Sequence, residues 1–385
     1  MGARRDRNQV PVSCCAGTVN VPILRKSLPG FRYPSRPART QKDTETISSD
    51  LFKLLFRSAD YPSQSQNSAI SFFRHNIIPY LGGSIETSQW HSFMTDDGTP
   101  IELSWDWSNS QTPPNIRFSL EPIGPQSGSR DPSNLLAPKE FQDRVVAQLP
   151  STKLEWFDHF SRDFVVGQNN HAEGHSSKLF YAFDMKRNGD MIAKAYFLPR
   201  FKAALQRISV WDAIQSSVRK APGCTSQNLH AFDALHEFFH QEQDIDLEML
   251  SIDLGSPTTS RIKIYFRSHR TDFASVKRIM TFNGTRTGPK HMEGIQKLHK
   301  LWMSIFECSA LMEAPLPSKS HRTAGVLYYA DFRLGDELPK VKLYIPVRHY
   351  ARSDSHICQA VTTFQVQQGH GKYVQRYKNI LAETL

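Results

Sequence analysis

The sequence is poor in the features that mark secreted, membrane-embedded and metal-binding proteins. It contains only 5 cysteines in 385 residues, without a CxxC pair or histidines at ligand spacing, so neither a disulfide scaffold nor a zinc site is expected. It has no run of about 18 apolar residues, and its charged N-terminal segment lacks the apolar stretch of a secretory signal. We therefore expect a cytoplasmic protein with reduced thiols and no membrane partner.

The charge distribution argues against a nucleic-acid partner. The formal net charge is +10, but residues 1–50 alone carry 9 Lys and Arg against 4 acidic residues. The remaining sequence is only mildly basic and has neither a sustained Lys/Arg stripe nor an RNA-binding aromatic signature. We expect no nucleic acid among the partners.

The chain divides into an irregular leader and a regular domain. Residues 1–47 are rich in Pro, Arg, Ser and Thr and show no apolar periodicity, so we expect a disordered or atypical leader there. From residue 48 to residue 385, two helical patterns and then two strand patterns follow one another repeatedly. The strand pairs are expected at 101–107 and 115–121, 178–185 and 191–198, 248–254 and 261–267, and 326–334 and 340–347.

These hairpins begin about every 70 to 80 residues, which indicates a structural repeat. Antiparallel hairpins that each carry a helix pair can close into one barrel, because closure pairs every strand edge. We therefore expect an α/β fold, an antiparallel β-barrel surrounded by helices. Two further helical patterns, 357–366 and 373–385, resemble the first half of a fifth unit. The fifth hairpin is apparently missing, which predicts a C-terminally incomplete barrel.

Three of the predicted strands share a Lys-x-Tyr pattern with apolar residues between. The pairs are Lys194 with Tyr196, Lys263 with Tyr265, and Lys342 with Tyr344. Because side chains alternate between the two faces of a strand, the polar residues converge inside a barrel if the apolar face packs on the helices. The alternative is an open sheet whose Lys/Tyr face is in contact with solvent.

A barrel interior with these residues would be strongly cationic. Its expected cations are Arg117, Lys194, Arg261, Lys263 and Lys342. Burying them unpaired would cost several kcal/mol per charge, so they need an anionic partner, and a diphosphate matches their donors. The faces of Tyr196, Tyr265 and Tyr344 could stabilise a carbocation. Groups that can bind a diphosphate beside groups that can stabilise a carbocation indicate prenyl transfer.

Glu102 is the candidate base for this chemistry. It lies in an aromatic-rich strand, where its carboxylate could accept a proton as an aromatic ring attacks an allyl cation. The alternative is an exposed strand glutamate without a role. Asp96 and Asp97 are followed by Gly98 and Thr99, so the DDxxD motif of magnesium-dependent isoprenoid synthases is incomplete, and we expect no metal site and no cofactor. The GxGxxG, GxxxxGK[ST], GxSxG and HExxH signatures are also absent.

Residues 93–105 (FMTDDGTPIELSW) and 117–122 (RFSLEP) closely resemble fungal aromatic prenyltransferases of the dimethylallyltryptophan synthase family. The segments 194–197 (KAYF), 261–266 (RIKIYF) and 342–346 (KLYIP) match the later strands of that family in order and spacing. The resemblance covers about residues 50 to 385. It implies the ABBA barrel of ten antiparallel strands, and metal-independent transfer from dimethylallyl diphosphate to an aromatic ring.

The resemblance also implies roles for individual residues. Glu102 and Lys194 would be catalytic, with Glu102 as the base that holds the acceptor. Tyr196 would help to shield the cation, and Phe93 and Met94 would contact the aromatic acceptor. Diphosphate binding would involve Arg117, Lys194, Tyr196, Arg261, Lys263, Tyr265, Lys342 and Tyr344.

The function expected from the resemblance is prenylation of an indole or phenolic polyketide in secondary-metabolite biosynthesis, including alkaloids. The expected partners are a small-molecule prenyl donor and an aromatic acceptor, with a homodimer as a candidate assembly. The alternative is a truncated, non-catalytic remnant that binds diphosphate or aromatic ligands, because an open barrel would admit water to the reaction centre.

Overall fold

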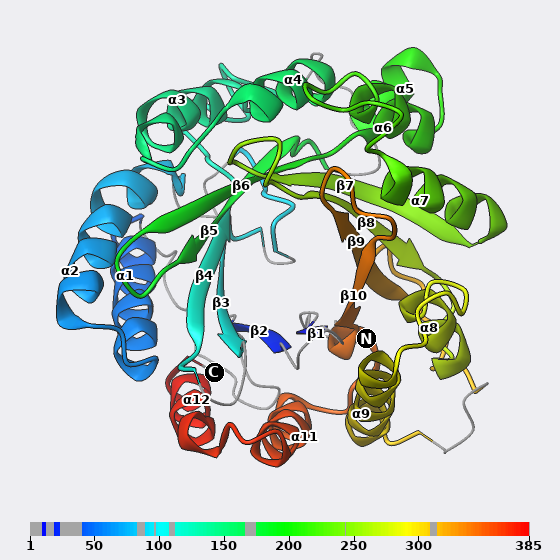
Figure 1. Cartoon of the computed structure of the whole chain (residues 1–385). Coiled ribbons are helices and arrows are strands. Elements are labelled where there is room, and N and C mark those ends of the chain that lie inside the picture. Colours follow the sequence, from blue (N-terminus) through cyan, green and yellow to red (C-terminus); the bar gives the residue numbers. More distant parts are fainter. Residues whose placement is uncertain are drawn as a thin grey trace.

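Alternating strand segments build a closed antiparallel barrel with helices on its outside (Figure 1). In the computed structural model, the described part of the chain comprises residues 10–12, 19–23, 41–82, 89–95, 98–107, 112–165, 175–242, 244–308 and 314–384. Its strands follow one another around the barrel in chain order, and each is antiparallel to both neighbours.

The four predicted hairpins are confirmed to within a few residues at each end. Their strands are β3 (Ile101–Trp107), β4 (Asn115–Leu120), β5 (Leu179–Met185), β6 (Met191–Phe197), β7 (Ile245–Asp253), β8 (Ile262–Ser268), β9 (Val326–Phe332) and β10 (Lys340–Ile345). The turn at Asn188 and Gly189 joins β5 to β6, as the Asn-Gly pair predicts. Gly189 has a φ of 93°, a conformation that glycine adopts without strain.

The helices form a ring around the strands, and none in the described residues has both the length and the apolarity needed to cross a membrane. Residues 200–218 form two helices, because Arg207 takes the left-handed conformation and ends the first. The ring consists of α1 (Gln41–Ser58), α2 (Ser63–Phe72), α3 (Leu136–Arg144), α4 (Glu155–Phe164), α5 (Arg200–Gln206), α6 (Val210–Val218), α7 (His230–Gln241), α8 (Phe273–Met280), α9 (Pro289–Phe306), α10 (Val347–Tyr350), α11 (Asp354–Gln367) and α12 (Gly371–Thr384).

Two short N-terminal strands close the barrel. β1 (Val10–Val12) pairs with β10, β2 (Val19–Ile23) pairs with β3, and β1 meets β2 where Val12 lies opposite Val19. This hairpin therefore occupies the position expected for the fifth hairpin, between β10 and β3 (Figure 1).

The prediction of an open barrel is therefore wrong for the described strands, because β1 and β2 fill the gap between β10 and β3. The C-terminally incomplete domain stays a prediction. The predicted leader over residues 1–47 is also wrong for residues 10–12, 19–23 and 41–47, the last of which begin α1. The remaining residues of that leader lie outside the described residues. Both strands contain valine or isoleucine, which favour strands, but with 3 and 5 residues in Pro-rich sequence they are too short to give a periodic signal.

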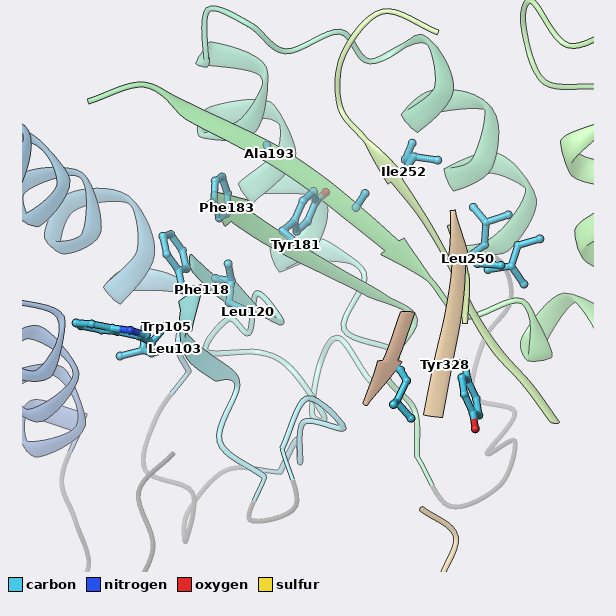
Figure 2. Close-up of a cluster of buried hydrophobic side chains, with 14 of the residues drawn as sticks. Leu103, Trp105, Phe118, Leu120, Tyr181, Phe183, Ala193, Leu250, Ile252 and Tyr328 are labelled. Carbon is cyan, nitrogen blue, oxygen red and sulfur yellow. The ribbon is translucent and has the colours of Figure 1, made fainter. Parts of the chain in front are cut away.

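The outward faces of the strands and the inward faces of the helices form one hydrophobic core that is rich in aromatic rings (Figure 2). The ring of Phe118 on β4 stacks on Phe183 of β5 at 4.9 Å between centroids, and Phe52 of α1 contacts Phe118 at 5.7 Å. Since the apolar face of each hairpin packs on helices, the opposite face is directed into the barrel. The lumen-facing arrangement is thus confirmed, and the open, solvent-facing sheet is excluded.

Closure by the N-terminal hairpin can be tested by deletion. Removing residues 1–24 should leave the backbone groups of β3 and β10 unpaired along one edge. We expect faster amide hydrogen exchange in β3 and β10, increased light scattering and a lower urea midpoint. The amides of β6 and β7, on the opposite side of the barrel, serve as the internal control. Unchanged exchange in β3 and β10 would show that the hairpin does not close the barrel.

Candidate active site in the barrel lumen

A layer of ion pairs crosses the lumen. On β4, the guanidinium of Arg117 lies 2.8 Å from Asp106 of β3 and 2.9 Å from Asp184 of β5. The Lys194 ammonium of β6 lies 2.6 Å from the same Asp184 carboxylate. Strand register explains the contact, because Arg117 and Asp184 are cross-strand partners on one face of the sheet.

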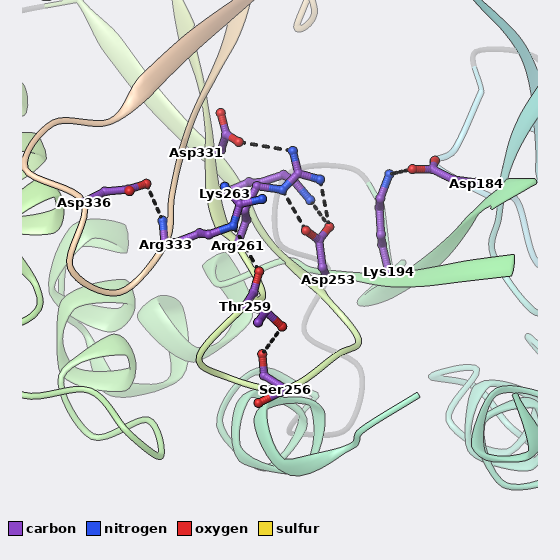
Figure 3. Close-up of polar contacts among 10 residues, drawn as sticks. All are labelled: Asp184, Lys194, Asp253, Ser256, Thr259, Arg261, Lys263, Asp331, Arg333 and Asp336. Carbon is purple, nitrogen blue, oxygen red and sulfur yellow. Dashed lines mark hydrogen bonds and ion pairs between the residues drawn. The ribbon is translucent and has the colours of Figure 1, made fainter. Parts of the chain in front are cut away.

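The ion pairs continue around the barrel (Figure 3). Asp253 of β7 accepts from the Nε of Arg261 at 2.7 Å and from the Nζ of Lys263 at 2.6 Å. Arg261 directly precedes β8 and also reaches Asp331 of β9 at 3.3 Å. The structure thus brings four of the predicted cations into one connected region of the lumen. Lys342 of β10 contacts this region through Tyr329, because the Lys342 Nζ lies 5.6 Å from the centroid of the Tyr329 ring.

The sequence argument that these cations need an external anion is therefore incomplete. These five cationic side chains share the ion-pair layer with four aspartates, Asp106, Asp184, Asp253 and Asp331. The aspartates were missed, although strand periodicity could have found them. Asp184, for example, lies two residues after Ala182 and four after Phe180, on the same face of β5.

Burial and charge pull the pKa values of this layer in opposite directions. Burial opposes ionisation of Asp184 and Asp253, but the adjacent cations outweigh it, so both carboxyl pKa values lie below their usual range. Burial lowers the pKa of Lys263 to about 7, although Asp253 partly offsets the effect. A bound anion would thus find Lys263 close to its titration point.

Four tyrosines form a second layer next to the ion pairs. The ring of Tyr265 lies 5.8 Å from Tyr196, 5.0 Å from Tyr329 and 6.2 Å from Tyr344 between centroids. Burial raises the pKa of Tyr196 to about 12, so its hydroxyl keeps its proton at neutral pH and can donate it in a hydrogen bond. Tyr329 was missed, although it alternates with Asp331 on the lumen face of β9.

A cavity of about 210 Å³ lies against the tyrosine layer. Both predicted acceptor residues, Phe93 and Met94, line it together with the predicted base Glu102. It also contains apolar side chains that were not predicted, and the five predicted cations are not among its lining residues. The full lining is Phe93, Met94, Thr95, Glu102, Ser119, Phe180, Tyr196, Glu248, Met249, Tyr265, Arg267, Thr323, Leu327, Tyr344 and Arg348.

One wall of the cavity carries a further charged group that sequence reasoning missed. Glu248 of β7 accepts from the Nε of Arg267 at 2.5 Å, and Arg267 also donates to the Thr323 carbonyl at 2.9 Å. On another wall, the ring of Phe93 stacks on His175 at 4.0 Å. The cavity therefore combines aromatic surfaces with polar groups on several walls.

A family comparison identifies this barrel. Residues 45–380 match the family described as tryptophan dimethylallyltransferase. The chain belongs to this family. The predicted resemblance is confirmed, and the protein is an aromatic prenyltransferase by homology.

Named relatives and solved structures agree with the family. The 4-O-dimethylallyl-L-tyrosine synthase of Claviceps purpurea is 33% identical over 82% of this chain and 74% of its own length. The 7-dimethylallyltryptophan synthase of Aspergillus fumigatus is 32% identical over 80% of this chain and 71% of its own length. The crystal structure of AnaPT from Neosartorya fischeri has a TM-score of 0.74 at 23% identity, covering 86% of this chain and 82% of AnaPT, which shows a common fold.

Within the described residues of this prenyltransferase, no three His, Cys, Asp or Glu side chains form a group that could hold a metal ion. Asp96 and Asp97, the start of the incomplete acidic motif, lie outside the described residues.

The lumen ion pairs should matter far more to stability than surface pairs do. Asp253→Asn removes the carboxylate shared by Arg261 and Lys263, so we expect a loss of about 3–5 kcal/mol in the free energy of unfolding. The matched control is Asp233→Asn, which breaks an exposed pair with Arg219 at 2.6 Å and should cost about 1 kcal/mol or less. Urea denaturation measures both. Equal losses in the free energy of unfolding would show that the lumen pairs contribute no more to stability than a surface pair does.

Proposed function

We propose that this prenyltransferase transfers a dimethylallyl group from dimethylallyl diphosphate to an indole or phenolic acceptor, without a bound metal. The observation that carries the proposal is the order of the lumen: buried cations, then tyrosines, then an aromatic cavity that contains Glu102. The relatives support it, because two of them are named for dimethylallyl transfer to tyrosine and to tryptophan. One solved neighbour, NotF, is described in complex with brevianamide F and DMSPP.

The charged layer is the proposed site of the diphosphate. An ammonium has three donors, and Lys194 and Lys263 each donate to one aspartate at 2.6 Å, which leaves donor capacity for phosphate oxygens. The proposed donor site comprises Arg117, Lys194, Tyr196, Arg261, Lys263, Tyr265, Lys342 and Tyr344. The aspartates hold these cations in place before the substrate arrives.

The tyrosine layer is the proposed site of the allyl cation. The bond between the allylic carbon and oxygen breaks, and its electron pair leaves with the diphosphate, whose added charge the Lys194 ammonium stabilises. The faces of Tyr196 and Tyr265 stabilise the cation and exclude water from it. The acceptor's aromatic ring, or its phenolic oxygen, then forms the new bond to carbon.

Glu102 is the proposed base. Its side chain lines the cavity on the lumen face of β3, where an acceptor contacting Phe93 and Met94 would lie. Glu102 would hold the indole N–H or phenolic O–H and take up the proton released after bond formation. The alternative of a non-catalytic remnant is not favoured, because it depended on an open barrel and the described strands close.

The setting of the reaction is inferred from relatives. These include a tryptophan-prenylating enzyme and a xanthone prenyltransferase of Emericella nidulans, which supports a role in secondary-metabolite biosynthesis. Alkaloids are one such product class. A cytoplasmic location and a homodimer stay predictions.

Glu102→Gln tests the assigned base. Glutamine keeps the size of the side chain but cannot take up the proton, so we expect transfer to fall by about 100-fold or more with the urea midpoint unchanged. Mass spectrometry of the prenylated acceptor gives the rate, and release of dimethylallyl alcohol reports donor ionisation separately. Wild-type transfer by this variant would reject Glu102 as the base.

Donor binding should depend on pH through Lys263. Its lowered pKa of about 7 leaves part of the ammonium uncharged at neutral pH, and a bound diphosphate would favour the charged form. Binding should therefore take up protons, and affinity should fall as the pH rises above about 7.

Calorimetry with inorganic diphosphate in buffers of different ionisation heat measures this proton uptake. Lys263→Arg keeps the charge but does not titrate in this range, so its uptake should be smaller than that of the wild type. Because diphosphate itself binds protons, the test compares the proton uptake of the wild type with that of Lys263→Arg. Identical uptake would exclude Lys263 as the titrating group.

A further inference from the structure

A buried carboxylate outside the cavity is bonded to four donors. Glu121 follows β4 and is only 1% exposed. One of its oxygens accepts from the indole Nε1 of Trp90 at 3.0 Å and from the amide of Asn134 at 3.5 Å. The other accepts from the hydroxyls of Ser92 at 2.5 Å and Ser177 at 2.7 Å. The proposed reaction uses none of these four partners or Glu121 itself.

The two serines connect Glu121 to the wall of the acceptor cavity. The backbone N–H of Phe93 donates to the Ser177 hydroxyl at 3.0 Å, and the backbone N–H of Met94 donates to the Ser92 hydroxyl at 3.0 Å. Since Phe93 and Met94 line the cavity, two hydrogen-bonded chains lead from one carboxylate to the segment that would contact the acceptor. Each hydroxyl donates its one proton to Glu121 and accepts from the backbone amide through an oxygen lone pair.

An ionised carboxylate satisfies all four donors of this arrangement at once. All four side-chain partners donate to Glu121, and a carboxylate only accepts hydrogen bonds. In a glutamine, the NH2 group would replace one of the two oxygens, so two of these donors would face another donor. Burial raises the pKa of Glu121 to about 7, which the hydrogen bonds from Ser92, Ser177 and Trp90 partly oppose. The four donors offset part of the cost of burying this carboxyl group, so the carboxyl and its partners form one connected unit.

We propose that Glu121 is a positioning residue: through Ser92 and Ser177 it holds the backbone of Phe93 and Met94 in the place that sets acceptor affinity. The expected effect on acceptor affinity rests on the proposed function. The structural part of the inference, the attachment of this segment to Glu121, stands independently of any reaction.

The test separates the two parts. Hydrogen exchange of the Phe93 and Met94 amides is measured in the free wild-type protein, in Ser177→Ala and in Glu121→Gln. Exchange should accelerate at Phe93 in Ser177→Ala and at both amides in Glu121→Gln. The matched control is Ser275→Ala, which removes another buried serine that donates to a carboxylate, Asp272 at 2.9 Å, on the outer helix α8. It should leave both amides unchanged.

Kinetics with L-tyrosine and L-tryptophan as acceptors then test the consequence. Ser177→Ala removes one of the two hydrogen-bonded chains between Glu121 and this segment, so the acceptor KM should rise about three- to tenfold while the KM for dimethylallyl diphosphate stays unchanged. Glu121→Gln should raise the acceptor KM further. A merely structural role would instead lower kcat through loss of folded protein and leave the acceptor KM unchanged.

Three results are distinguishable. Faster exchange together with a raised acceptor KM supports the positioning role. Unchanged exchange in both variants, or faster exchange with an unchanged acceptor KM, overturns it. If the wild type prenylates neither probe nor any other aromatic acceptor, the proposed function fails, while the exchange data still decide whether Glu121 holds the segment.

Discussion

The pairing of buried cations with buried aspartates is the interaction on which the lumen depends. A barrel whose interior contained only Arg117, Lys194, Arg261, Lys263 and Lys342 would be opposed by desolvation and mutual repulsion. Cross-strand placement of Asp106, Asp184, Asp253 and Asp331 resolves this, because each carboxylate lies within reach of cations on a neighbouring strand. The protein can therefore fold with the cations of the proposed donor site already in place.

The tyrosines separate this charged layer from the cavity that is the proposed acceptor site. Tyr265 contacts the rings of Tyr196, Tyr329 and Tyr344, so an allyl group leaving the charged layer would meet aromatic surface before it met the acceptor. The cavity beyond has its own polar groups, Glu102 and the Glu248–Arg267 pair, on different walls. In the proposed reaction, this order would give the diphosphate leaving group, the allyl cation and the base separate surroundings within one barrel.

Much of this arrangement follows from period-two patterns in the sequence. The Lys-x-Tyr strands, the hairpin order and the lumen position of Arg117 could be predicted because one face of each strand is apolar. The partners of the cations were harder to find, because only strand register shows that Asp253 lies opposite Lys194. Asp184 and Tyr329 could have been found by extending the alternation to the first strand of each hairpin.

Other features could not be predicted from local patterns. The closing strands Val10–Val12 and Val19–Ile23 are too short for a periodic signal, and their role depends on the edges left by β3 and β10. Glu121 gives no sign in the sequence of its four donors, since Trp90, Asn134 and Ser177 come from distant segments.

The central claim is tested most directly by a metal-free transfer assay. Purified protein is incubated with dimethylallyl diphosphate, EDTA and a panel that includes L-tyrosine, L-tryptophan and phenolic polyketides, and products are read by mass spectrometry. We expect one acceptor class to gain a single C5 unit. Dimethylallyl alcohol alone, or no product from any acceptor, would contradict the account of a closed, water-excluding prenyltransferase barrel.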